Sequence, residues 1–483
     1  MRQNITNLVS IAFVGGMVGK GLRYGINVVV ARGLGAEALG LFAFGTVLMK
    51  AVSVVSQMGL DRAAQKYIPI YVADDRPALV SGTAVLCLGV PFVLGTVAAA
   101  LLHSQWHVLD DVLQSGFGPT TRLFLVGVPV FSAMMVGATA TRGFKQTKYF
   151  VYIRDVGQSV VAFVLVAVGA FVLADVEAVV AGYLVSIGVG SVLAVYYLAR
   201  QGALSLDVRP RLPYREVLGF ALPLTVAAVT LYLITWTDIL MLGVFTTPAE
   251  VGWYQAAYQT SVLLAVVLQA TYSIFPALAS ELYHSGRHNR LARVYTAVTK
   301  WVATLTLFGF AFLYVFLGEL LGIFGTAIPA AEWALIVLAL GQVTAAVVGP
   351  AGYLLTMSEY EQLQMVNSVV VSVANVGLNY VLIQEYGIVG AAAATGVSFV
   401  ALNALRLIQT WYLLGLQPYS RQYWRGLVAV VGAIPAMILG RALPLPGVVR
   451  VIVAGVVATA VFGAIVWHLG LTDQDYLLLE SLE

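Results

Sequence analysis

Apolar stretches of about twenty residues recur along the whole chain of 483 residues. A stretch of this length can cross the hydrocarbon core of a bilayer as one helix, because each helical residue adds about 1.5 Å and the core is about 30 Å thick. Hydrophobic residues make up 60% of the chain and charged residues only 10%, whereas a soluble domain carries about 25% charged residues. The sequence therefore predicts an all-α polytopic membrane protein.

The hydropathy pattern predicts about fourteen transmembrane helices. The first twelve are expected near residues 8–31, 37–60, 79–102, 121–141, 153–174, 177–199, 217–243, 251–278, 299–323, 331–356, 363–384 and 388–414, and the last two near residues 425–442 and 448–469. The N-terminal apolar stretch has no cleavage pattern of small residues, so we expect a retained first helix rather than a signal peptide.

Lysine and arginine are distributed unequally between the predicted connections. With a cytoplasmic N-terminus, the inner segments hold 19 of the 26 cations, and the outer connections hold only Arg32, Arg122, Arg441 and Arg450. Short cytoplasmic loops of membrane proteins are enriched in these residues, so we predict that both termini are cytoplasmic. The cations are not pooled in one patch, which argues against a nucleic-acid partner despite the net charge of +3.

A shift of 212 residues brings the two halves of the chain into register. It superimposes five pairs of identical residues: Gly40 and Gly252, Tyr71 and Tyr283, Leu79 and Leu291, Gly137 and Gly349, Ser186 and Ser398. The shift covers six helices, an even number, so both halves would enter the membrane with the same polarity, as in transporters with parallel repeats. We therefore predict an N-terminal six-helix lobe at residues 1–204, a C-terminal six-helix lobe at 205–416, and two additional helices with a cytoplasmic tail at 417–483.

Four charged residues inside predicted transmembrane helices are candidates for a functional role. Lys20 and Arg23 share one face of the first helix, and Lys50 lies in the second. Lys20 is roughly 18 Å from the inner end of its helix, too far for its side chain to reach the interface, so it must face a wet cavity or a partner. Three cations favour an anion site, because one acid, Asp238 on the seventh helix, cannot neutralise them all. A structural pairing with Asp238 is the alternative, and Asp238 could instead bind a coupling cation or accept a proton.

Signatures of enzymes are mostly missing from the sequence. The five histidines lie in connections or at a helix end, without the spacing of metal ligands, so we assign no metal. No P-loop is present, and we expect no cofactor. The single cysteine, Cys87, lies in an apolar stretch and is expected to pack there.

Several segments resemble one known family. The segments ARGLGAEALG at residues 31–40 and GLDRAAQKYI at residues 59–68 are similar to the start of polysaccharide flippases of the multidrug/oligosaccharidyl-lipid/polysaccharide exporter superfamily. The segments TDILMLG at 237–243, VGWYQAA at 251–257, NVGLNYVL at 375–382 and YGIVGAA at 386–392 resemble later helices of the same family. The resemblance covers at least the first 414 residues.

The resemblance implies two six-helix lobes that face a central cavity and transport by alternating access. The implied substrate is a polyprenyl phosphate- or pyrophosphate-linked oligosaccharide, which moves from the cytoplasmic to the outer leaflet of the cell membrane for cell-surface glycan assembly. Family members hold the phosphate with cationic cavity residues, a role that Lys20, Arg23 and Lys50 suit by position. The other implied partners are membrane lipids, glycan-assembly proteins and a coupling ion, H+ or Na+.

Two other functions stay open at this point. A cation-coupled multidrug exporter of the same superfamily would need acids in its cavity, and the excess of cations argues against it. A membrane-embedded glycosyltransferase, polymerase or ligase usually has a larger outer loop with acids, arginines or histidines. The longest outer connection, residues 103–120, offers Asp110 and Asp111, with Arg122 just after it. The sequence therefore favours a transporter over an enzyme.

Overall fold

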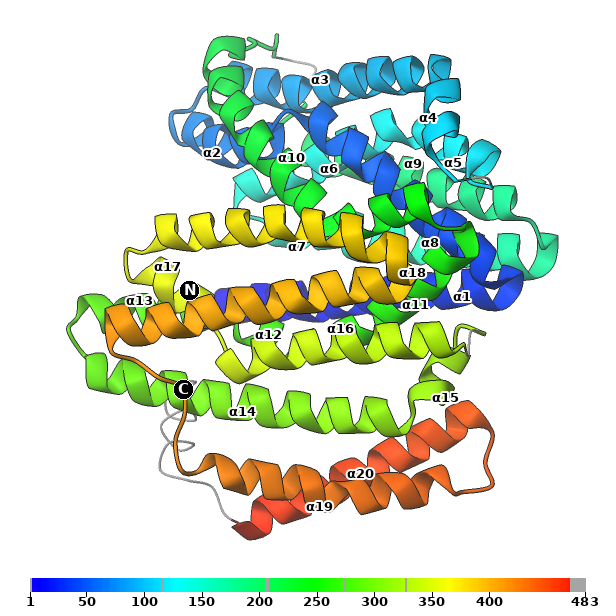
Figure 1. Cartoon of the computed structure of the whole chain (residues 1–483). Coiled ribbons are helices and arrows are strands. Elements are labelled where there is room, and N and C mark those ends of the chain that lie inside the picture. Colours follow the sequence, from blue (N-terminus) through cyan, green and yellow to red (C-terminus); the bar gives the residue numbers. More distant parts are fainter. Residues whose placement is uncertain (1, 115, 205–207, 273, 326–327, 470–483) are drawn as a thin grey trace. The chain divides into compact units, whose positions relative to one another are not determined.

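The computed structural model describes residues 2–114, 116–204, 208–272, 274–325 and 328–469, with side chains from residue 14 onward except at residue 234. The regular structure in these residues is helical throughout. Contacts divide the chain into two compact units, residues 1–252 and 253–483, coloured blue to green and green to red in Figure 1. The predicted cytoplasmic tail after residue 469 lies outside the described residues.

The first unit is built from α-helices joined by short 3-10 and π-helical segments. In chain order these are α1 (Arg2–Gln57), α2 (Leu60–Ala73), α3 (Pro77–Ser104), α4 (Trp106–Val112), α5 (Gly118–Phe124), η1 (Leu125–Gly127), α6 (Val128–Ala140), η2 (Thr141–Phe144), α7 (Thr147–Phe150), η3 (Val151–Gln158), α8 (Ser159–Val168), η4 (Gly169–Leu173), α9 (Val176–Arg200), α10 (Tyr214–Phe245) and the start of α11 (Pro248–Val262). Because α10 packs on α1 and α2, it belongs to this unit, although the lobe boundary predicted from the sequence precedes it.

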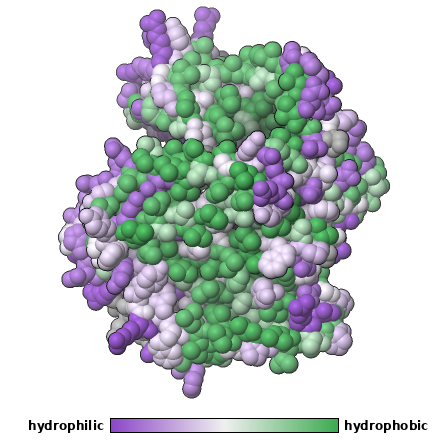
Figure 2. Space-filling model, viewed as in Figure 1, coloured by the Kyte–Doolittle hydropathy of each residue, from purple (hydrophilic) through white to green (hydrophobic). Residues whose placement is uncertain are grey.

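The second unit continues the helical pattern. Its helices are the rest of α11, α12 (Ala265–Thr271), α13 (Phe275–His284), α14 (His288–Val315), α15 (Leu317–Gly322), α16 (Pro329–Val348), α17 (Ala351–Met357), α18 (Glu361–Leu414), α19 (Tyr423–Arg441) and α20 (Gly447–Leu469). On the face shown in Figure 2, hydrophobic side chains cover the middle of α14, α16 and α19, and hydrophilic side chains gather at the helix ends. This distribution suits helices that cross a bilayer.

Eleven helices among the described residues are long and apolar enough to span a membrane, or twelve if α12 and α13 form one broken span. Two of the eleven, α1 and α18, each contain two helices that meet at a glycine with non-helical angles, Gly35 (φ 87°, ψ −178°) and Gly387 (φ 55°, ψ −130°). Both glycines lie in connections expected from the sequence. The all-α polytopic architecture is confirmed, and the number of fourteen spans stays a prediction.

Two helices predicted as continuous are interrupted in the structure. The predicted helix at 251–278 is divided into α11, α12 and α13, and Pro276 lies in the first turn of α13. The predicted helix at 331–356 breaks at Gly349 and Pro350, between α16 and α17. Proline has no N–H group to donate to the preceding turn, so a helix commonly begins at it rather than running through it.

Glycines on α1 allow the helix that contains η3 and α8 to approach closely. A Cβ atom at Gly19 would lie 2.6 Å from the carbonyl oxygen of Asp155, and one at Gly15 would collide with Val151. Gly15 and Gly19 are four residues apart and so lie on one face, as in the small-residue motif that brings membrane helices together. This packing places the first turns of η3 directly against α1.

A second close approach joins α1 to the beginning of α11. A Cβ atom at Gly40 would collide with the carbonyl oxygen of Pro248, and one at Gly252 would collide with the carbonyl oxygen of Ala36. The shift of 212 residues maps Ala36 onto Pro248 and Gly40 onto Gly252. The contact is therefore reciprocal. Gly40 meets Pro248 in the second segment, and the equivalent glycine, Gly252, meets the equivalent residue, Ala36, in the first.

Polar side chains connect the two halves of α18 across the bend at Gly387. Arg406 donates to Gln364 at 3.3 Å, Asn367 and Gln409 exchange two hydrogen bonds at 2.6 and 3.0 Å, and Asn375 donates to Ser398 at 3.0 Å. Amide hydrogen bonds between helices replace the water that these groups lose in a membrane. They hold Gln364, near the beginning of α18, against Arg406, near its end.

The last two helices pack against each other and against α14, as Figure 1 shows. Their apolar contact is built from residues on all three helices, including Phe312, Met437 and Phe462. At one end, Glu319 lies 3.5 Å from Arg441 and 3.6 Å from Arg450. These ion pairs connect both additional helices to α15.

Candidate anion-binding site

Arg23 on α1 forms an ion pair with Asp155 on η3 in the first unit. Both terminal nitrogens of the guanidinium lie 3.3 Å from Oδ1 of Asp155, and Nη1 also donates to the hydroxyl of Ser159 at 3.4 Å. Asp155 is buried, with 8% of its surface exposed, whereas the side chain of Arg23 is 36% exposed. Arg23 thus pairs with the acid through one edge of its guanidinium, and its side chain remains partly exposed.

Two further cations surround this pair. Arg154, next to Asp155 on η3, is close enough to Arg23 for the two positive charges to interact. Lys50, on the second half of α1, is half-buried, and the charges that act on it most are those of Arg154 and Arg23. Three cations thus lie within electrostatic reach of one another, and one of them, Arg23, pairs with a carboxylate. We call Arg23, Lys50, Arg154 and Asp155 the charged cluster.

Aromatic rings hold the arginine of η3 in place. The guanidinium of Arg154 lies 5.5 Å from the centre of the Phe150 ring, and that of Arg142 lies 3.5 Å from the same ring. Cations are attracted to the face of an aromatic ring, more strongly where water is excluded. Tyr183 on α9 is also buried within electrostatic reach of Arg23 and Arg154. Aromatic rings as well as polar groups therefore border the charged cluster.

The π-helical turn of η3 determines which way its charged residues face. A π-helix adds one residue to a turn and rotates the following side chains, and such turns are frequent at functional sites. In η3 the adjacent residues Arg154 and Asp155 both come into reach of Arg23. Ser159, just after this turn, accepts from Arg23 and donates to the carbonyl oxygen of Arg154 at 3.1 Å.

The charged cluster is suited to hold an anion rather than a cation. Counting full charges, three cations and one carboxylate leave an excess of positive charge within the membrane-spanning helices. Charges at this depth are costly unless they face water or a partner, so they mark functional sites in membrane proteins. Guanidinium groups present paired N–H donors that match phosphate oxygens, and lysine adds a point charge.

Two of the three cations predicted from the sequence lie in this cluster. Arg23 and Lys50 come within electrostatic reach of each other. Lys20 lies on α1 three residues before Arg23, and its side chain is exposed. In the structure Arg23 pairs with Asp155. Asp238 is buried in α10, where its Oδ1 accepts from the backbone N–H of Ile239 at 2.9 Å.

Sequence reasoning missed Arg154 and Asp155. Arg154 and Asp155 lie at the start of the apolar stretch at 153–174, where charged residues are ordinary. The spacing of Gly15 and Gly19 predicts a close helix contact for α1, but it does not identify the residues of the partner helix. Among the described residues, no group of three or more His, Cys, Asp or Glu side chains could hold a metal ion.

Solved structures of two membrane transporters share this fold. The lipid II flippase MurJ in an inward closed conformation superimposes with a TM-score of 0.67, at 10% identity, and the match covers 95% of this chain and 98% of MurJ. An inward-facing multidrug resistance MATE family transporter of the MOP superfamily superimposes with a TM-score of 0.65, at 15% identity, over 84% of this chain and 97% of that chain. At these identities the likeness shows the fold.

Sequence comparison assigns the chain to a narrower group of proteins than the fold does. The probable low-salt glycan biosynthesis flippase Agl15 of Haloferax volcanii is 25% identical over 421 residues, which cover 85% of this chain and 84% of that protein. The family of polysaccharide biosynthesis proteins matches residues 5–281, more than half of the chain. The matched region contains the charged cluster and the whole first unit after residue 4. This multi-pass membrane protein belongs to the polysaccharide biosynthesis protein family.

Proposed function

We propose that this protein is a flippase that moves a polyprenyl phosphate- or pyrophosphate-linked oligosaccharide from the cytoplasmic to the outer leaflet of the cell membrane. The charged cluster carries the proposal, because the lipid-linked sugar has to bring a phosphate through the membrane and the cluster offers an excess of positive charge there. Membership of the polysaccharide biosynthesis protein family and the similarity to Agl15 support it. Both termini are then cytoplasmic, and alternating access moves the substrate.

The ion pair between Arg23 and Asp155 gives the site a resting state and a bound state. Without substrate, Asp155 neutralises Arg23 at 3.3 Å. A phosphate carries more negative charge and more acceptor oxygens than a carboxylate, so it competes for the exposed edge of Arg23 and for Arg154 and Lys50. Asp155 then returns to Arg23 when the phosphate leaves. The carboxylate keeps the site from binding its substrate irreversibly.

Transport by purified protein in proteoliposomes tests the proposal. The cluster variant has glutamine in place of Arg23, Lys50 and Arg154. The control variant has glutamine in place of Arg62, Arg209 and Arg211. Both variants remove three positive charges, and the control residues are exposed. We expect the cluster variant to flip a fluorescent polyprenyl phosphate-linked oligosaccharide at least about 100-fold more slowly, because a hydrogen bond to a charged group contributes about 1.5–3 kcal/mol.

A folded cluster variant that transports as fast as the control variant would falsify the role of the cluster. Folding is checked by thermal unfolding of both variants in detergent. Absence of transport by the unmodified protein, with every glycan offered, would contradict the flippase proposal itself.

We also propose that transport is coupled to H+ or Na+. Asp238 is the acid that we propose for it, because it is buried at 6% exposure within α10. Replacement by asparagine should make transport insensitive to an imposed ion gradient. Transport that still follows the gradient in Asp238→Asn would exclude this residue.

A further inference from the structure

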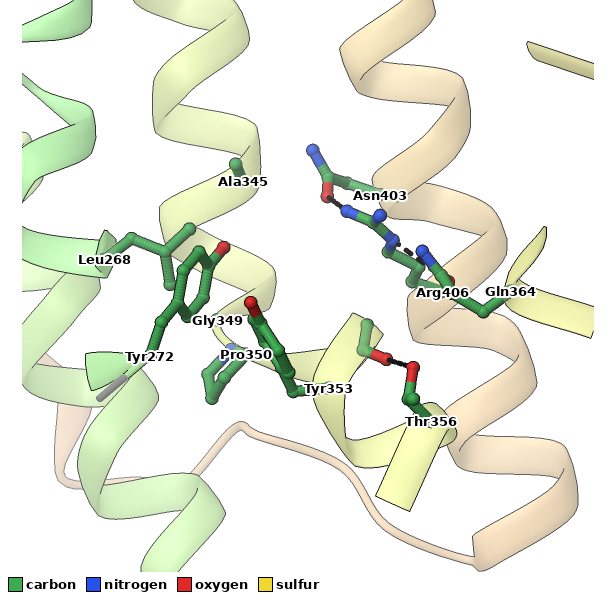
Figure 3. Close-up of a pocket in the computed structure, with 11 residues that line it drawn as sticks. Leu268, Tyr272, Ala345, Gly349, Pro350, Tyr353, Thr356, Gln364, Asn403 and Arg406 are labelled. Carbon is green, nitrogen blue, oxygen red and sulfur yellow. Dashed lines mark hydrogen bonds between the residues drawn. The ribbon is translucent and has the colours of Figure 1, made fainter. Parts of the chain in front are cut away.

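A polar cavity of about 340 Å³ lies inside the second unit (Figure 3). Its wall comes from α12, α16, α17, α18 and the break between α16 and α17, so it is separate from the charged cluster of the first unit. The residues that give it polarity are Tyr272, Tyr353, Gln364, Asn403 and Arg406. The volume is at the lower end of the roughly 300–1,000 Å³ that is usual for small-molecule sites.

Arg406 is the charged residue of this wall. Its Nε donates to Oε1 of Gln364 at 3.3 Å, and its Nη1 donates to Oδ1 of Asn403 at 3.4 Å. Both acceptors are neutral amides, and among the described residues no carboxylate acts on its charge. A guanidinium has five N–H donors, so three have no hydrogen-bond partner within the described part of the chain. An arginine in a membrane helix without an acid is costly and marks a functional site.

The surroundings hold the guanidinium in one orientation. Asn403 is 3% exposed and donates to the hydroxyl of Thr344 at 3.4 Å, which turns its oxygen toward Arg406. A Cβ atom at Gly352 would lie 3.1 Å from Nε and 3.2 Å from Cζ of Arg406, so the glycine makes room for the flat group. The donors are therefore fixed before any ligand arrives, which reduces the entropy cost of binding.

Two tyrosines form the opposite side of the cavity. The ring centres of Tyr272 and Tyr353 are 4.6 Å apart, and Figure 3 shows both rings facing the same space as Arg406. Tyr272 lies within electrostatic reach of the Arg406 charge. Each ring combines an apolar face with a hydroxyl that can donate and accept. Leu268, Ala345 and Pro350 complete an apolar part of the wall.

We propose that this cavity binds an acidic sugar, a pyranose that carries a carboxylate, as part of the transported glycan. This inference rests on the proposed flippase function. The guanidinium edge of Arg406 matches one carboxylate in a bidentate pair. Amide and hydroxyl groups of Gln364, Asn403 and Thr356 suit sugar hydroxyls, and the tyrosine rings suit the C–H face of the pyranose. One cation matches a single carboxylate better than it matches a pyrophosphate.

Two substrates that differ in one group test the proposal. Proteoliposomes receive polyprenyl phosphate-linked glucose or polyprenyl phosphate-linked glucuronate, which share the lipid phosphate and differ in the carboxylate. We expect the unmodified protein to transport both, and Arg406→Gln to slow the glucuronate substrate by about tenfold or more, because a charge-assisted hydrogen bond is lost. The glucose substrate should be transported at the unmodified rate. Arg293→Gln, at an exposed position of the same unit, is the matched control.

A further variant and a competing anion keep the result interpretable. Gly352→Ala crowds the guanidinium and should slow only the glucuronate substrate. Free inorganic phosphate should compete at the charged cluster and should therefore slow both substrates to the same extent, in the unmodified protein and in Arg406→Gln.

Two outcomes would overturn the proposal. The first is equal slowing of both substrates in Arg406→Gln, which would place a shared phosphate in the cavity. The second is unchanged transport of glucuronate in a folded Arg406→Gln protein. Because the cluster variant should slow both substrates, failure of the cavity proposal and failure of the flippase proposal give different patterns.

Discussion

Asp155 sets how much positive charge the first unit offers to an anion. It is the acid within bonding distance of Arg23, and it also acts on Arg154. At separations of 3 to 4 Å, charges in a partly buried site interact by several kcal/mol even with an effective dielectric constant near 20. A carboxylate in this position therefore weakens the binding of every other anion, and the strength of binding should respond strongly to its removal.

Replacing Asp155 with asparagine should tighten anion binding. The amide keeps the shape of the side chain and removes one negative charge, so pyrophosphate would meet three cations without competition. We expect roughly tenfold or greater affinity at low ionic strength, and a smaller gain at high salt, because salt screens charges that water can reach. Isothermal titration calorimetry of the purified protein with inorganic pyrophosphate measures this affinity.

The exposed acid Asp74 provides the control for this measurement, since its side chain is 46% exposed and pairs with Arg76. Asp74→Asn should leave the affinity unchanged. Equal or weaker pyrophosphate binding in a folded Asp155→Asn protein would show that Asp155 only supports the structure.

Among the candidate site residues, the sequence singles out those that lie deep within an apolar stretch. Lys20, Arg23 and Lys50 stand inside long apolar stretches, so hydropathy alone marks them as unusual. Asp155 and Arg406 stand near the ends of theirs, where charges are ordinary. Which of these end residues turns inward depends on tertiary contacts, here the packing of η3 on α1 and the bend of α18 at Gly387.

At the scale of elements, close helix contacts decide where charged residues point. The register of η3 against α1 is set by Gly15 and Gly19, which let the backbone at Asp155 approach α1 directly. The sequence predicted the bends at Gly35 and Gly387, because charged or small residues interrupt the apolar stretches there. It did not predict the breaks within the eighth and tenth helices, because apolar residues continue through them.

Substituting Gly19 with alanine should separate α1 from η3. The new Cβ atom would lie 2.6 Å from the carbonyl oxygen and 2.9 Å from the Cα atom of Asp155, so the backbone would have to move. Overpacking of this kind costs about 1–3 kcal/mol. We expect a lower midpoint of thermal unfolding in detergent and weaker pyrophosphate binding, because Arg154 and Asp155 would shift away from Arg23.

Gly16→Ala is the control for this pair of helices, since a Cβ atom there would meet nothing within 4 Å. It should unfold at or slightly above the temperature of the unmodified protein, because alanine favours helix over glycine by about 1 kcal/mol. Equal effects of the two substitutions would mean that the α1 and η3 contact does not limit stability.

At the scale of the whole molecule, the orientation in the membrane rests on the distribution of cations. The predicted inner segments hold most of the lysines and arginines, and this bias normally fixes which ends of the helices face the cytoplasm. Cys87 is completely buried among apolar side chains of the first unit. The unmodified chain therefore offers little background to a thiol reagent.

Single cysteines introduced at exposed positions should report this orientation. Asp111 lies in a predicted outer connection and Asn289 in a predicted inner one, and both are exposed. In intact cells, a membrane-impermeant maleimide should label Asp111→Cys and should label Asn289→Cys only after permeabilisation. The unmodified protein is the control, and the reverse pattern would mean that the termini face outward.

The reciprocal contact of Gly40 with Pro248 and of Gly252 with Ala36 has an evolutionary consequence. Two copies of a half-length chain that met across a two-fold axis would make this same contact twice, once in each direction. A duplication that fused the two copies would retain it with both glycines already in place. After such a fusion neither glycine could have been replaced alone, because each would be confined by the backbone of the other copy.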